Sequence, residues 1–88
     1  MILEPEMQKP QIEYPCEWAY KVIGSDVNKI LLAIDTAAMG LVYDVSPSNV
    51  SSNGKYFSLN FKLEVPNETV RNLIYEKLEK SPDIKFVL

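Results

Sequence analysis

Three segments of the chain alternate between apolar and polar residues, and this period of two predicts half-buried β-strands. They are residues 16–23, which end at Gly24, residues 55–65, and residues 83–88. The second segment has the most regular alternation, and its apolar face consists of Phe57, Leu59, Phe61, Leu63 and Val65. Residues 41–52 also read as extended. Pro47 within them cannot donate to a strand ladder, which predicts a strand at a sheet edge.

Two segments carry apolar residues at helical spacing. In residues 25–40 the apolar stripe is Val27, Ile30, Leu31, Ile34 and Ala38, and in residues 66–82 it is Val70, Leu73, Ile74 and Leu78. Ser25 and Asn67 are the expected N-caps. Gly40 is expected to end the first helix in a left-handed conformation. Asn53–Gly54, between the second and third strands, predicts a tight hairpin turn.

The resulting order is β-α-β-β-α-β, and both crossovers must be right-handed. The arrangement that buries both helix stripes is α+β: a ferredoxin-like, four-stranded antiparallel sheet with two helices on one face. The first and third strands are expected to be central. The predicted core combines the helix stripes with Trp18, Tyr20, Val22, Phe57, Leu59, Phe61, Leu63 and Phe86.

Composition agrees with one soluble domain. The chain has 88 residues, of which 47% are apolar and 24% charged. Residues 1–13, with two prolines and no clear period, are expected to form a flexible N-terminal arm, and residues 14–88 the single domain. The first ten residues resemble no signal peptide and no apolar run could cross a bilayer, so a cytoplasmic location is expected and no membrane association.

Residue types exclude most catalytic chemistry. Cys16 is the only cysteine and the chain has no histidine, so neither a disulfide within the chain nor a Cys/His metal site can form. No general base is available to activate Cys16, and the carboxylates are scattered. The sequence SNVSSNGK has one glycine leading into a strand, unlike a phosphate-binding loop. We expect no enzyme activity, no cofactor and no metal.

The sheet face opposite the helices is the candidate interaction surface. On the predicted register it presents Glu17, Ala19, Lys21, Ile23, Tyr56, Ser58, Asn60, Lys62, Glu64, Lys85 and Val87. The residues chosen as its binding candidates are Lys21, Ile23, Tyr56, Ser58, Lys62 and Lys85. Tyr56 is its one aromatic residue, whereas an RNA-binding sheet presents about two or three. Because the chain has a net charge of −3, nucleic acid is a disfavoured partner.

Three stretches of the sequence carry a family resemblance. YPCEWAYKVIG, VSPSNVSSNGKYFSL and IYEKLEKSPDIKFVL together resemble the bacterial YbeD-like family of small uncharacterised proteins. The likeness covers residues 14–88. It implies a ferredoxin-like fold similar to ACT-type regulatory domains, and it supplies no catalytic residues.

The leading functional hypothesis is therefore a non-enzymatic regulatory or small-molecule-binding module resembling ACT-type domains. One alternative is a protein-interaction adaptor that uses the open sheet face or a strand edge. A second is single-stranded RNA binding. The partners left open are another protein, a small metabolite and a second copy of the chain in a homodimer.

Overall fold

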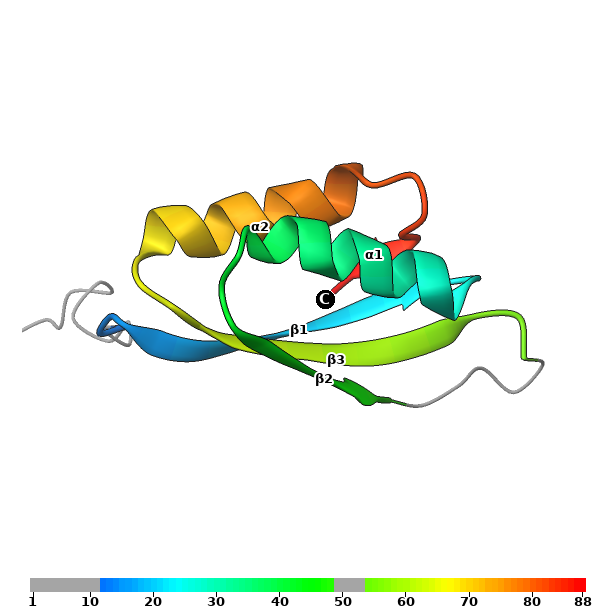
Figure 1. Ribbon diagram of the computed structural model, residues 1–88, viewed down its shortest axis with the longest axis horizontal. Helices are drawn as coiled ribbons and strands as arrows, with labels where there is room; N and C mark the ends of the chain where they lie inside the picture. The colour runs from blue at the N-terminus through cyan, green and yellow to red at the C-terminus, as the bar shows by residue number, and fades with distance from the viewer. Residues whose placement is uncertain (1–11, 49–53) are drawn as a thin grey trace, which may run out of the picture.

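The domain is a four-stranded sheet covered on one face by two helices. A computed structural model describes residues 12–48 and 54–88. The elements in chain order are β1 (Cys16–Gly24), α1 (Val27–Ala38), β2 (Tyr43–Pro47), β3 (Phe57–Val65), α2 (Glu68–Lys80) and β4 (Phe86–Val87). The antiparallel sheet has the order β2-β3-β1-β4, and α1 and α2 lie side by side above it (Figure 1). This confirms the predicted ferredoxin-like βαββαβ fold.

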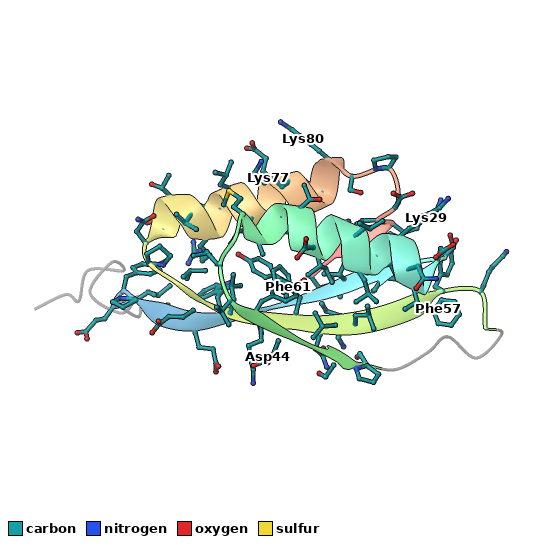
Figure 2. The ribbon with its side chains drawn as sticks, viewed as in Figure 1. Lys29, Asp44, Phe57, Phe61, Lys77 and Lys80 are labelled. Atoms are coloured by element: carbon teal, nitrogen blue, oxygen red, sulfur yellow. The ribbon has the colours of Figure 1, made fainter. Side chains whose placement is uncertain are left out.

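The centre of the sheet is the long pair formed by β1 and β3. They pair over their whole length, from Cys16 opposite Val65 to Gly24 opposite Phe57. Because the side chains alternate, even-numbered β1 residues and odd-numbered β3 residues turn toward the helices. Phe61 points from β3 into the space below the helices, while Asp44 on β2 points to the opposite side (Figure 2).

The buried core agrees with most of the predicted one. It includes Tyr20, Val22, Leu59, Phe61 and Leu63 from the sheet, and Ile30, Ile34, Ala37, Ala38, Ile74 and Leu78 from the helices. Phe61 is fully buried, and its ring stacks on Tyr20 at 5.5 Å and meets Tyr43 edge-on at 5.4 Å. Trp18 and Phe57 are partly buried and pack against this core.

The prediction of which residues in the last strand face the helices is wrong. Phe86 is 59% exposed and lies opposite Ile23 on the open face, while Val87 lies opposite Val22 on the helix side. Ile84 is buried, as predicted, but it belongs to the turn after α2, where its N–H donates to the Ser81 carbonyl. A period of two holds only within a strand, so the burial of Ile84 does not carry over to Phe86.

The helix ends show one further correction. Asp26, not Ser25, is the N-cap of α1, and its Oδ1 accepts a hydrogen bond from the Lys29 N–H at 3.2 Å. Asn67 caps α2 as predicted, accepting from the Val70 N–H at 2.8 Å. The first helix ends with two left-handed residues, since Met39 precedes Gly40 in that conformation.

Two sequence predictions lie outside the described residues. One is the N-terminal arm, apart from Ile12 and Glu13, and the other is Asn53 of the predicted hairpin turn. Its partner Gly54 has φ +68°, which is the left-handed conformation that such a turn needs.

Candidate functional site

The open face of the sheet brings four of the six predicted candidates together. Lys21 and Ile23 lie on β1 beside Ser58 and Lys62 on β3, with Ile23 directly opposite Ser58. The two central strands present no aromatic side chain on this face, because its positions are Glu17, Ala19, Lys21, Ile23, Ser58, Asn60, Lys62 and Glu64. The stacking surface of an RNA-binding sheet is therefore missing from these two strands.

The other candidates lie at the margins of this face. Tyr56 precedes β3 and is half-buried, and Lys85 precedes β4 and is exposed. Phe86, rather than Lys85 or Val87, is the β4 residue that lies beside Ile23. Ser58 is only 9% exposed, so it offers little surface to a partner. Ser58 is thus the one buried residue of the six candidates.

A different feature stands out at the outer edge of β1. The last strand, β4, is two residues long and pairs only with Val22 and Ile23. One residue further on, the Lys21 N–H donates to the Leu88 carbonyl at 3.0 Å, and the Leu88 N–H donates back at 2.9 Å. Before Lys21, β1 continues for five residues with no described strand on that side.

The hydrogen bonds of Lys21 show which backbone groups face this edge. In an antiparallel ladder, alternate residues direct both their N–H and C=O to the same neighbour. Lys21 bonds outward to Leu88, so Ala19 and Glu17 also direct their backbone groups outward. Within residues 12–48 and 54–88, no backbone group pairs with the N–H and C=O groups of Glu17 and Ala19. We call the outer side of residues 16–20 the free β1 edge.

A pocket of about 380 Å³ opens beside the free β1 edge. Its floor is the helix-facing side of β1, at Trp18 and Tyr20, and α2 supplies its wall. The full lining is Trp18, Ala19, Tyr20, Arg71, Asn72, Tyr75 and Leu88. A strand laid along the edge would pass in front of this pocket.

Arg71 is the main charged group of the pocket. Its guanidinium lies over the Trp18 ring at 4.4 Å from the ring centroid. It also donates to the Asn72 side-chain oxygen and lies 3.6 Å from the Glu68 carboxylate. Its side chain is only 18% exposed. The cation is thus already balanced, so the pocket is an aromatic and apolar site rather than a strong anion site.

Tyr20 ties the floor of the pocket to its wall. Its hydroxyl donates a hydrogen bond to the Arg71 backbone carbonyl at 2.7 Å. Burial raises the pKa of Tyr20 from 10.0 to about 12, against a smaller lowering effect of the Arg71 charge. The neutral phenol therefore belongs to the folded state.

We expect the free energy of unfolding to depend on Tyr20 at high pH. The stabilisation is complete below pH 10, where an unfolded tyrosine is also neutral, and is lost as the pH rises toward 12. Tyr20→Phe should cost about 1 kcal/mol at pH 7, through the lost hydrogen bond. It should also flatten the decline above pH 10. Urea denaturation of both proteins at pH 7, 10 and 11 measures this, and parallel pH profiles would contradict it.

A larger groove of about 530 Å³ lies between the two helices. Leu32 on α1 is 68% exposed there, and Lys77 and Lys80 on α2 also line the groove. Asp83 also lines the groove, and Lys80 lies 3.6 Å from Glu76. The C-terminal end of α2 adds partial negative charge. These opposing charges give the groove no clear preference for an anion.

Candidate metal ligands do not cluster in the part of the chain that the structure describes. No three His, Cys, Asp or Glu residues there could hold a metal ion together. Cys16 is a free, partly buried thiol at the start of β1. None of the described helices is long and apolar enough to cross a membrane.

The described residues form a small ferredoxin-like α+β domain in which the outer side of residues 16–20 of the central strand β1 pairs with no other described strand. The chain belongs to the family described as "Protein of unknown function (DUF493)", which it matches over residues 9–88. An uncharacterised protein of Helicobacter pylori strain J99 is 33% identical over 75 residues, covering 85% of this chain and 87% of that protein. A UPF0250 protein of Hahella chejuensis is 29% identical over 90 residues, covering 97% and 98%.

Solved structures agree with the fold. The solution structure of protein HP0495 from Helicobacter pylori has a TM-score of 0.82 and 29% identity, covering 100% of this chain and 97% of that one. A second solution structure, of hypothetical protein HP0495, has a TM-score of 0.62 and 32% identity, covering 92% and 94%. These similarities confirm a family of small uncharacterised proteins. The YbeD-like name and the likeness to ACT-type domains stay predictions.

Proposed function

We propose that this chain is a non-enzymatic protein-interaction module that accepts an extended segment of another polypeptide at the free β1 edge. The observation that carries the proposal is the two-residue length of β4, which leaves the backbone groups of Glu17 and Ala19 without a partner strand among the described residues. Unpaired strand edges are templates for strand addition, in which backbone hydrogen bonds give affinity and neighbouring pockets give specificity.

The edge suits this role better than the open face does. The open face carries mixed charge, with Glu17, Lys21, Lys62 and Glu64 spread over two strands. At the edge, four backbone groups lie in one row beside an apolar pocket. Each backbone hydrogen bond adds about 0.5–1.5 kcal/mol net. Four such bonds and one buried side chain would together contribute roughly 4–9 kcal/mol before the cost of association is subtracted, which suits a weak, reversible interaction.

Replacing Ala19 by proline tests the edge directly. The Ala19 N–H faces outward, so proline should remove no hydrogen bond within the sheet while blocking an added strand. Ala19→Val is the matched control, because valine has as many side-chain carbons and keeps the N–H. We expect affinity capture from the source cells to recover a partner with wild type and Ala19→Val, and at least tenfold less with Ala19→Pro.

Circular dichroism melts would establish that both variants fold, and Glu17→Pro offers a second block at the same edge. Equal partner recovery with Ala19→Pro and Ala19→Val would contradict strand addition.

The pocket also favours a second candidate, a regulatory module that binds a small metabolite beside Trp18 and Arg71. An amino acid or related metabolite that raises the melting temperature of wild type and Ala19→Pro equally would favour that candidate instead.

A further inference from the structure

We infer that the partner of the free β1 edge is an antiparallel segment with the pattern acidic–large apolar–basic, read from its N-terminus, and that its apolar side chain fills the Trp18 pocket. The inference rests on the proposed function and adds the chemistry of the partner. It follows from three features of the edge: which positions bond, what the pocket is made of, and how charge is placed on the open face.

The bonding positions fix the register of the added strand. Glu17 and Ala19 direct their backbone groups outward, so the partner residues opposite them form the hydrogen-bonded pairs. Trp18 lies between them, opposite the partner residue whose side chain points toward the helices. We take the strand to be antiparallel because every pair in this sheet is antiparallel and such ladders are the more stable kind.

The pocket selects the side chain opposite Trp18. Trp18, Tyr75 and Arg71 are among the residues that line the pocket, and the Arg71 guanidinium already contacts Trp18, Asn72 and Glu68. A charged side chain would lose hydration there without gaining a free counter-ion. An aromatic or large aliphatic side chain would bury its surface in this mainly apolar lining. With about 380 Å³, the pocket has room for one such side chain.

Charges on the open face of the sheet favour particular residue types at the two partner positions on either side of the large apolar residue. The partner residue opposite Glu17 shares its face, so a lysine or arginine there forms a cross-strand pair. The partner residue opposite Ala19 has only a methyl group facing it, and Lys21 lies on the diagonal of the same face. An acidic residue suits that place. In an antiparallel strand the residue opposite Ala19 comes first, which gives the order acidic–apolar–basic.

A second copy of this chain fits the edge less well. A two-fold pairing of β1 with itself about Trp18 would place Glu17 opposite Ala19 of the other copy and leave both without the charged partner described above. It would also bring two Arg71 guanidiniums and two α2 N-termini toward one axis, since Arg71 lies directly over Trp18 in the first turns of α2. Like charges and helix N-termini repel one another. A single extended segment avoids this crowding.

Two synthetic peptides of identical composition test the pattern. The first is acetyl-Glu-Phe-Lys-Val-Thr-amide and the second, with the charges exchanged, is acetyl-Lys-Phe-Glu-Val-Thr-amide; in both, the acetyl group lies opposite Tyr20 and leaves Leu88 in its place opposite Lys21. Each is titrated into ¹⁵N-labelled protein by NMR, which measures millimolar affinities. We expect the first peptide to shift the Glu17 and Ala19 amide signals and the Trp18 indole signal, and to bind about five- to tenfold more tightly than the second.

A third peptide, with alanine in place of phenylalanine, should bind at least fivefold more weakly than the first. Tyr75→Ala, a change at a partly exposed helix position, should weaken the first peptide similarly and leave the fold intact. Equal affinity for the first two peptides, or shifts confined to the open face, would overturn the pattern. If the peptides fail while partner capture still depends on the Ala19 N–H, the pattern is wrong and the proposed edge stands. If capture is insensitive to Ala19→Pro, the proposed function falls as well.

Discussion

Phe61→Ala is expected to lower the free energy of unfolding by about 4 kcal/mol, the largest effect of any single truncation in this domain. Phe61 is fully buried, with an exposed fraction of 0%. Its ring contacts the rings of both Tyr20 and Tyr43. The substitution removes this buried surface and leaves a cavity beneath both helices. A domain of this size has a total stability of roughly 5 kcal/mol, so only about 1 kcal/mol would remain and roughly 15% of the molecules should be unfolded without denaturant.

Phe57→Ala is the matched control for this prediction. Phe57 lies on the same strand and the same face, but at the end of β3 and only partly buried. Its loss should cost about 1–2 kcal/mol. Urea denaturation followed by circular dichroism measures both values. Equal losses at the two positions would contradict the central role of Phe61 in the core.

Gly24→Ala is expected to cost about 3 kcal/mol, for a different physical reason. A Cβ at this position would lie 2.6 Å from the Asp83 carbonyl oxygen and 2.9 Å from a side-chain carbon of Ile30. The oxygen is backbone and cannot rotate away. The turn before β4 would therefore have to shift, and the short pairing of β4 with β1 would weaken.

Gly40→Ala separates this contact from ordinary glycine effects. Gly40 has φ +86°, but a Cβ there meets no atom within 4 Å. Its replacement should cost only about 1 kcal/mol, from the left-handed backbone. Thermal melts of the two variants provide the comparison. A smaller loss for Gly24→Ala than for Gly40→Ala would show that the turn accommodates a methyl group.

Much of the fold could be predicted from sequence because its signals are local. Alternation over residues 16–23 and 55–65 is long enough to define two strands and their buried faces. Helical spacing and the cap at Asn67 define the second helix in the same way. The first cap was misassigned because Ser25 and Asp26 are both good caps, and only the backbone geometry selects Asp26.

The candidate site was less predictable. Trp18 and Tyr20 were expected in the core, and sequence gives no sign that Arg71, more than 50 positions away, stacks on Trp18. Such contacts depend on how α2 is placed over β1. The predicted surface residues Lys21, Ile23, Ser58 and Lys62 do share one face, but no observation assigns them a partner.

The sequence by itself determined the order of the elements, the two central strands and the apolar faces that unite sheet and helices, because alternation and helical spacing are properties of neighbouring residues. Only the tertiary structure decided where β4 begins, that Phe86 faces outward, and that the edge of β1 beside the pocket pairs with no strand in the part of the chain that the structure describes. The physical reason is that the turn at residues 81–85 uses Ile84 to complete the core. The strand β4 therefore begins only at Phe86, and this start depends on contacts between distant parts of the chain.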